Sequence, residues 1–502
     1  MHSNKFTLAL ILLLLGTFNA VAQDSILLSG CRRGVLPEAA RSRRTKAQTF
    51  RVGGDFYQGN RRQLVILAAF QDKQFQGGSA EALIKWDKIF NEENYHEDPF
   101  VGSVHDYFYD QSYGKFNLKF DLIYVNLPDS CKKYRSTAKD DEFSQFMVDD
   151  IVDALETQNI DWSQYDWNDD GFVNQLLIIY AGKGMNAGGD DNTIWPHQWW
   201  LSYRIDQTNP QGKNYRSYRT VDSGGKEYIV DCYCCIQELI EVTSVKASFG
   251  TICHEYSHCF GFPDFYYGGV MCLGGWDLMD SGNYCGNGFC PTGYSAHERW
   301  LMGWMNPVEL TSDTEVSHMP ALCEEPWSYL VRNDGHENEY YIVENRQKTN
   351  WDSFLPGSGL VVFHVDYDES IWSSFLTIPN NEVKYRYHII PANNMQYNIP
   401  INSSGWAYPY ISNTISNDSL TNNSVPAAKL NNPNTDGSLL MNKSLNNIRV
   451  DNGLASFSFS NDSPTDIVDV EAEGKPQELY RFGSIGIFRY PNGVVKKVIT
   501  RP

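Results

Sequence analysis

The stretch His254-Glu-Tyr-Ser-His-Cys-Phe-Gly-Phe-Pro-Asp264 determines how the rest of the chain is interpreted. On a helix, His254 and His258 lie one turn apart on the same face, so both imidazoles can reach one metal ion. Glu255 is rotated by about 100° from His254. Its carboxylate would therefore miss the metal but reach a metal-bound water.

The residues around this stretch predict a helix followed by a sharp turn. Ser244 is an acceptable N-cap, and Gly261 can end the helix in the left-handed region, with Pro263 preventing its continuation. The turn would bring Asp264 back to the two histidines. Apolar residues recur at spacings of three and four and predict the buried stripe of this helix: Val245, Phe249, Ile252, Tyr256 and Phe260.

Two imidazoles and one carboxylate with a fourth position open to water describe a catalytic zinc site, because a structural site is closed by four side chains. Zinc lowers the pKa of its bound water to roughly 7 and polarises a carbonyl. Two other interpretations stay open. The motif can occur by chance on a core helix, and Glu298, on a later predicted helix, can replace Asp264 as third ligand. His197 is a candidate ligand by residue type, but nothing in its spacing commits it to that role, and a hydrogen-bonded structural histidine is the favoured interpretation.

These residues resemble the metzincin type of metallopeptidase and, more closely, the immune inhibitor A family of secreted bacterial metallopeptidases. The resemblance implies a metzincin-like zinc peptidase domain and a methionine turn at Met279, beneath the metal. The alternation of helices and strands predicts an α+β fold, and the short β-like runs after about Pro307 predict a β-rich, sandwich-like second domain. Tyr284, five residues past Met279, is a candidate to stabilise the oxyanion. The pieces that carry the resemblance run in the family's order: 64–72, 104–116, 165–182, 194–197, the zinc motif, 276–279, 344–347 and 355–357.

The domain organisation follows from composition and periodicity. We expect a signal peptide over 1–22, a leader or propeptide over 23–60, the catalytic domain over 61–307, a β-rich accessory domain over 308–460, and a linker with a small tail over 461–502. Predicted helices cover 80–92, 100–109 and 140–158. Predicted strands cover 64–70, 116–125, 175–180, 340–344, 359–365 and 385–391.

The first 22 residues combine Lys5, an apolar run and Ala20-Val-Ala22, which is typical of a signal peptide cleaved after Ala22. We therefore expect a secreted protein without a membrane span, a monomer, with attachment to the cell surface as a further option. The 41 basic and 61 acidic residues give a net charge of −20, which argues against a nucleic-acid partner. Protein or peptide substrates are the expected partners.

Eleven cysteines in an exported chain predict disulfides, with one thiol left over. Their pairing cannot be read from the sequence. Cys272, Cys285 and Cys290 flank the methionine turn and could staple it. The leader contains Cys31, a thiol that could block the metal before processing, although a short processed leader is the simpler interpretation.

A second metal is suggested by Asp166-Trp-Asn-Asp-Asp-Gly-Phe-Val-Asn174. Asp166, Asn168, Asp170 and Asn174 occupy positions 1, 3, 5 and 9 of a calcium loop, with glycine at position 6. Position 12 is Leu177, where a bidentate acid belongs. The alternative is an Asx-rich turn that leads into the next strand.

Taken together, the residues predict a zinc endopeptidase with His254, His258 and Asp264 as ligands and Glu255 as general base. Two other functions remain open. The chain can be an inert binding or adhesion protein that keeps the peptidase fold, or a zinc hydrolase that acts on a non-peptide bond.

Overall fold

The computed structural model describes residues 57–136, 143–187, 189, 192–203, 218–239, 249–372, 378–381, 383–395, 397, 400–461, 477–482, 485–489 and 495–499. The expected signal peptide, Cys31, Ser244, Val245 and the linker after residue 461 lie outside these ranges. The chain divides into two compact units, Met1–Ser460 and Asn461–Pro502.

A five-stranded mixed sheet forms the first half of the larger unit, with strand order β2-β1-β3-β7-β4. The pairs β1–β2, β1–β3 and β3–β7 are parallel, and β4 runs antiparallel to β7 at the edge. Parallel neighbours need crossover connections. Helices lie between β1 and β2 and between β2 and β3 in the chain, whereas the connection from β3 to β7 contains β4 and a β-hairpin. The strands are β1 (Gly59–Ala69), β2 (Phe116–Asn126), β3 (Leu176–Lys183), β4 (His197–Trp200) and β7 (Cys232–Leu239).

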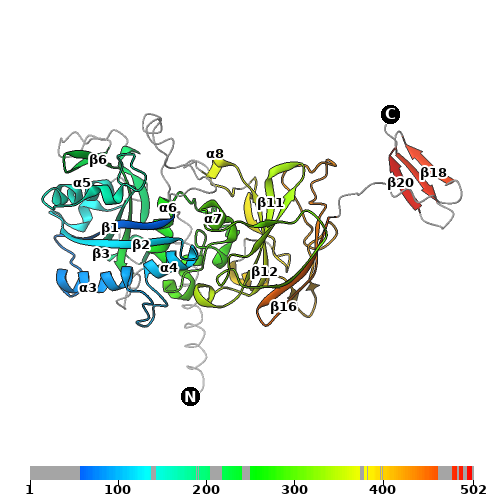
Figure 1. Ribbon diagram of the computed structural model, residues 1–502, viewed down its shortest axis with the longest axis horizontal. Coiled ribbons are helices and arrows are strands. Elements are labelled where there is room, and N and C mark those ends of the chain that lie inside the picture. The colour runs from blue at the N-terminus through cyan, green and yellow to red at the C-terminus, as the bar shows by residue number, and fades with distance from the viewer. Residues whose placement is uncertain are drawn as a thin grey trace, which may run out of the picture. The chain divides into compact units, whose positions relative to one another are not determined.

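Helices cover this sheet. In the view of Figure 1, α3 and α5 lie on either side of the strands β1, β2 and β3. A hairpin of β5 (Arg219–Ser223) and β6 (Lys226–Val230) precedes β7. The helices are α3 (Gly78–Asn91), α4 (Val104–Gln111), α5 (Ser144–Leu155), α6 (Phe249–Cys259), α7 (Ala296–Leu301) and α8 (Glu369–Trp372).

After α7 the chain is mainly β-structure. One sheet has the order β13-β12-β11-β10-β8 and another has the order β16-β17-β9. Side chains of both sheets meet in a second apolar cluster that includes Val316, Val343 and Phe457. The strands are β8 (Val308–Glu309), β9 (Thr314–Met319), β10 (Ser328–Asn333), β11 (His336–Arg346), β12 (Gly359–Asp366), β13 (Tyr387–Ile389), β14 (Tyr410–Ile411), β15 (Ser416–Asn417), β16 (Ser444–Asp451) and β17 (Leu454–Ser460).

The first apolar cluster extends across the expected domain boundary at 307. It joins Leu64 and Tyr256 from the first half of the chain with Ile342, Phe363 and Trp406 from the second. The two halves of the larger unit therefore share one continuous core. The division into 61–307 and 308–460 stays a prediction.

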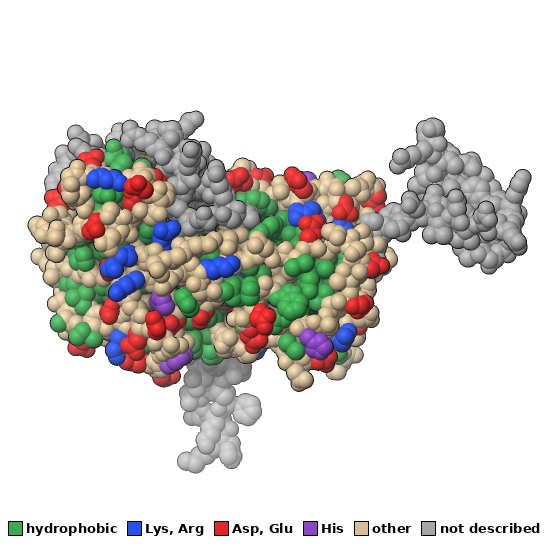
Figure 2. Space-filling view, viewed as in Figure 1, with side chains coloured by type: hydrophobic (Ala, Val, Ile, Leu, Met, Phe, Trp, Pro, Cys, Tyr) green, Lys and Arg blue, Asp and Glu red, His purple; other side chains and the backbone are tan. Residues whose placement is uncertain are grey.

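The smaller unit contains an antiparallel sheet of β18 (Gln477–Phe482), β19 (Ile485–Arg489) and β20 (Val495–Ile499). Among the described residues, no helix is long and apolar enough to cross a membrane. On the face shown in Figure 2, acidic side chains are interspersed with basic ones over the described surface.

Candidate metal centre and active-site cleft

The helix α6 holds both histidines in the interior. Residues Phe249–His258 of this helix are all buried. Gly250 allows the helix to lie against the chain near Asn283, since a Cβ at position 250 would be 1.9 Å from the Asn283 carbonyl oxygen. On its other side, the Tyr256 hydroxyl donates to Gln63 Oε1 at 2.8 Å, which ties α6 to β1.

The turn after α6 has the expected geometry. Gly261 adopts φ +100°, a conformation that side-chain-bearing residues rarely adopt. Its N–H donates to the His258 carbonyl at 2.9 Å. His258 Nδ1 donates to the Phe262 carbonyl at 2.7 Å, so the turn also orients the ligand ring. The chain then returns Asp264 to the histidines.

Three ligand atoms converge. His254 Nε2 is 3.3 Å and His258 Nε2 is 3.5 Å from Asp264 Oδ1, and the three atoms lie within 4.8 Å of one another. The imidazole rings are 4.8 Å apart and nearly perpendicular, at 83°. Tetrahedral ligands at about 2.1 Å from one ion are about 3.4 Å apart, so the two shorter distances suit a zinc-sized cation.

The polar atoms at the centre also favour a cation. His258 Nε2 and Asp264 Oδ1 are buried and meet no hydrogen-bond partner in favourable geometry. His254 Nδ1 donates to the Leu278 carbonyl at 2.9 Å, which leaves the Nε2 lone pair for the cluster. Buried acceptors without donors are costly unless a cation or water satisfies them. The residues therefore fit the expected ion.

The pKa values of these residues reflect the same convergence. Burial opposes the charge of Asp264, but the imidazoles of His258 and His254 outweigh burial and lower its pKa. Burial also opposes protonation of His254, yet its hydrogen bond to Asp264 and the charge of Glu255 raise its pKa to about 9. A bound cation would take the place of this proton.

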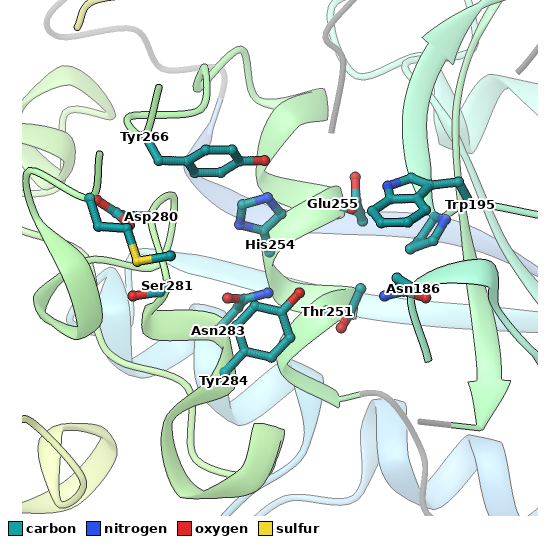
Figure 3. Close-up of a pocket in the computed structure, with 12 residues that line it drawn as sticks. Asn186, Trp195, Thr251, His254, Glu255, Tyr266, Asp280, Ser281, Asn283 and Tyr284 are labelled. Atoms are coloured by element: carbon teal, nitrogen blue, oxygen red, sulfur yellow. The ribbon is translucent and has the colours of Figure 1, made fainter. Parts of the chain in front are cut away.

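Glu255 and His254 line one cleft. Glu255 is 1% exposed and follows the ligand His254 directly in α6. Figure 3 shows Glu255 between His254 and Trp195, on the wall formed by α6. The role of Glu255 as general base stays a prediction.

The methionine turn contacts the metal centre through its backbone, because Leu278 provides the carbonyl that holds His254. Met279 is buried, its carbonyl accepts from Phe265 N at 3.0 Å, and its N–H donates to Asp277 Oδ1 at 2.8 Å. The turn therefore links the segment after Asp264 to the first histidine. The position of the Met279 sulfur beneath the metal stays a prediction.

Glu298, the alternative third ligand, has another task. Its Oε2 accepts from Ser295 N at 2.8 Å and from Ser295 Oγ at 3.0 Å, which completes a capping box at the start of α7. It also shares a side-chain hydrogen bond with Asp277, and burial raises the pKa of both groups, that of Asp277 to about 6. The structure brings Asp264, and not Glu298, to the histidines.

The other predicted residues are separate from the ligand cluster. Tyr284 is 43% exposed and lines the cleft, and in Figure 3 its ring lies on the far side of His254 from Tyr266. His197 is a structural histidine, because Nδ1 donates to the Trp195 carbonyl at 2.6 Å and Nε2 lies 3.1 Å from Tyr233 Oη.

The predicted calcium loop closes on itself. Asp166 accepts from Asp170 N at 3.1 Å and from Gly171 N at 2.9 Å, and Asn174 Oδ1 accepts from Trp167 N at 2.6 Å. The Asn168 amide donates to Asp170 Oδ2 at 2.9 Å. These bonds are typical of an Asx-rich turn. Calcium binding stays a prediction.

Ten of the eleven cysteines lie in the described residues, and no disulfide joins any two of these ten. The expected staple is not seen: Cys285 Sγ lies 3.5 Å from the Gly275 carbonyl and Cys290 Sγ 3.4 Å from that of Trp351. Side-chain hydrogen bonds connect Cys259, at the end of α6, with Cys232 and Cys234 of β7.

Sequence reasoning missed several residues that line the cleft, among them Tyr266, Asp280 and Asn283. Tyr266 follows Asp264 by two residues, and Asp280 follows Met279 directly. Their closeness to the motif is the only signal that the sequence offers. It does not say which side chains face the cleft.

The fold and the site can now be compared with known proteins. Residues 64–305, just under half of the chain, match the family model of the immune inhibitor A peptidase M6 catalytic domain, which places this segment among the peptidases. By this match, residues 64–305 belong to the immune inhibitor A peptidase family. The chain is 24% identical over 297 residues to immune inhibitor A of Bacillus thuringiensis subsp. alesti, covering 49% of this chain and 41% of the relative. The match thus spans less than half of that protein's length.

Proposed function

We propose that this chain is a secreted zinc-dependent endopeptidase with a metzincin-like catalytic domain. One observation carries the proposal: His254 Nε2, His258 Nε2 and Asp264 Oδ1 converge at distances suited to one cation, at a cleft that Glu255 also lines. The family supports peptide bonds as the substrate. Protein or peptide substrates, a monomeric state and the cleavage of a signal peptide after Ala22 belong to the same proposal.

The roles of the residues follow from their positions. His254, His258 and Asp264 would hold the zinc ion, which when bound acidifies a water molecule and polarises the scissile carbonyl. Glu255 would accept the proton of the attacking water and pass it to the leaving amine. The Leu278 and Phe262 carbonyls keep the two imidazoles in the tautomer that offers Nε2. Tyr284 is positioned to contact the substrate from the opposite wall.

The test replaces Glu255 with Gln, which keeps the size of the side chain and removes the base. We expect the variant to bind zinc as the unmodified protein does and to lose about 10²- to 10⁴-fold in kcat/KM on a casein substrate. Metal analysis and proteolysis with and without a chelator provide the measurements. Equal activity of the two proteins would contradict the mechanism.

The two other functions predict different results. An inert binding protein would hold zinc and cleave no protein. A hydrolase of a non-peptide bond would leave casein and peptides intact, yet lose its own activity in Glu255→Gln. Cleavage of casein that depends on both zinc and Glu255 excludes both alternatives.

A further inference from the structure

One end of the cleft is built from the segment that follows Met279. Asp280, Ser281, Asn283 and Tyr284 line it, together with Met271. Figure 3 shows Asp280 and Ser281 on one side of His254 and Glu255 on the other. A substrate residue that lies over the metal centre therefore has this segment beside it.

Asp280 uses only one of its carboxylate oxygens in the fold. Oδ2 accepts from Leu273 N at 3.0 Å and from Gly274 N at 2.9 Å, and these bonds shape the turn before Met279. Oδ1 is buried without a hydrogen-bond partner, although the residue is only 3% exposed and lines the cleft. A purely structural role explains Oδ2. It leaves Oδ1 unexplained, since buried acceptors are normally satisfied.

Asn283 repeats the pattern three residues later. It is 4% exposed, it lines the same cleft, and its Oδ1 also has no hydrogen-bond partner. Two acceptor oxygens, one of them on a carboxyl group, thus lack a hydrogen-bond donor in residues that line one part of the cleft. An ammonium group carries three donors and no acceptor, which suits such a wall.

Apart from the proposed metal ligand His254, the charged side chains that line the cleft are acidic. Glu255 and Asp280 are acidic, and among its described lining residues there is no lysine or arginine. The ring of Tyr284 adds an aromatic face, which attracts cations. Burial raises the pKa of Asp280 to about 8 despite its backbone hydrogen bonds. An ammonium ion beside Oδ1 would stabilise the ionised form, so cation binding and loss of this proton are coupled.

We propose that Asp280, assisted by Asn283, selects substrates with a lysine side chain near the scissile bond. The inference rests on the proposed peptidase function and names its substrate class. Asp280 Oδ1 accepts from the lysine ammonium as an ion pair, and Asn283 Oδ1 accepts a second hydrogen bond. Both residues act on recognition, while Glu255 acts on the water.

The test measures binding, so it does not depend on turnover. Two fluorescein-labelled alanine peptides are used, one with a single central lysine and one with norleucine, its uncharged analogue. Alanine at the other positions leaves the register of the peptide in the cleft unrestricted, so the lysine or norleucine side chain can reach the site beside Asp280. In the inactive Glu255→Gln protein we expect the lysine peptide to bind about tenfold more tightly, the ratio for one well-placed ion pair.

Two substitutions test whether Asp280 causes this difference in affinity. Asp280→Asn retains an oxygen acceptor for Leu273 N and Gly274 N, and in the Glu255→Gln background it should reduce the affinity ratio to about one. Asp87→Asn, an equal charge change on the exposed face of α3, should keep the ratio. Equal affinity of the two peptides before substitution, or a ratio that survives Asp280→Asn, would overturn the inference.

Two further measurements cover a variant that does not fold and a failure of the proposed peptidase function. If Asp280→Asn does not fold, Asn283→Asp adds a carboxylate at the same wall and should raise the ratio about tenfold, and an unchanged ratio would overturn the inference. Casein cleavage by the unmodified protein tests the proposed function separately. Lysine selectivity without cleavage would contradict the peptidase function alone, whereas cleavage without selectivity would contradict only the role of Asp280.

Discussion

Asp264 connects the two histidines of the candidate metal centre. Its Oδ1 lies 3.3 Å from His254 Nε2 and 3.5 Å from His258 Nε2. Glu298 competes for this role by residue type, yet its Oε2 is engaged by the Ser295 N–H and hydroxyl. The carboxylates also differ in charge state. Neighbouring imidazoles lower the pKa of Asp264, whereas burial and Asp277 raise that of Glu298.

Two isosteric substitutions distinguish these carboxylates. We expect Asp264→Asn to weaken zinc binding by at least about 100-fold, more than the loss of a residue that only supports a ligand. Glu298→Gln keeps an acceptor for Ser295 and should bind zinc as the unmodified protein does. Competitive titration with a chromophoric chelator measures both affinities. Loss of zinc from Glu298→Gln with retention in Asp264→Asn would reverse the assignment.

At the scale of residues, the sequence predicts which side chains meet where the meeting depends on local spacing. The convergence of His254 and His258 follows from one helical turn, and that of Asp264 follows from the glycine turn. The role of Glu255 as base stays a prediction. Asp280 and Asn283 could not be predicted, because their role depends on which side of a buried turn faces the cleft. That orientation is set by packing against distant segments, such as the contact of Gly250 with the Asn283 carbonyl.

At the scale of elements, α6 and the turn at Gly261 act together. The helix aligns the histidines, and the positive φ of Gly261 reverses the chain so that Asp264 reaches them. Without this reversal the helix would present two ligands and lack the third. The turn at Gly261 is therefore expected to contribute more to metal affinity than to the stability of α6.

A matched pair of glycine substitutions tests this view. Gly261→Ala places a Cβ at φ +100°, and Gly224→Ala places one at φ +63° in the β5–β6 turn, where nothing lies within 4 Å of the new atom. Each should lower the free energy of unfolding by roughly 1–3 kcal/mol. Only Gly261→Ala should also weaken zinc binding. Denaturant unfolding and metal titration measure the effects, and equal zinc affinity in both variants would refute the view.

Element boundaries were predictable where hydrophobic periodicity was strong. The strands predicted at 64–70 and 116–125 correspond to β1 and β2, and the helix predicted at 80–92 corresponds to α3. The helix predicted at 100–109 was wrong at its start, since α4 begins at Val104. Ser103 and Asp106 form a capping box there, which fixes the first turn.

At the scale of the whole molecule, α7 is the junction of the two halves of the larger unit. His297 lies among the rings of Tyr340, Tyr367, Trp372 and Tyr387, all from the second half of the chain. Burial lowers the pKa of His297 to about 3, so the junction holds a neutral imidazole. Protonation would place a charge among apolar rings.

The sign of the pH effect follows from this pKa. An unfolded histidine titrates near 6.5, so between that pH and about 3 the unfolded chain binds the proton more tightly. The His297 contribution to stability is complete above pH 6.5 and is lost as the pH falls, by about 1.4 kcal/mol per pH unit. His297→Gln should remove that slope in denaturant unfolding between pH 6 and 4. Parallel pH profiles of the two proteins would contradict the prediction.

The domain organisation was the part least accessible from sequence. Composition changes near residue 307, and β-structure does dominate after it. Composition cannot show that Ala296 N donates to Glu344 Oε2 at 2.7 Å, or that Arg346 pairs with Glu344 at 3.0 Å and Asp352 at 2.8 Å, all buried. The bond between Ala296 and Glu344 joins residues 48 positions apart, and a contact of this kind has no local signature.

The buried pairs at α7 bear on how this protein can change over generations. A recombination event that transplanted residues 64–305 onto a foreign partner would separate the Ala296 amide from Glu344, and it would uncover Phe249 and Phe265, whose rings pack against Trp351 and Tyr387. We therefore expect that the peptidase segment cannot be moved to another protein without the strands that follow it. Its inheritance is tied to the strands that follow it, and viable hybrids must exchange both together.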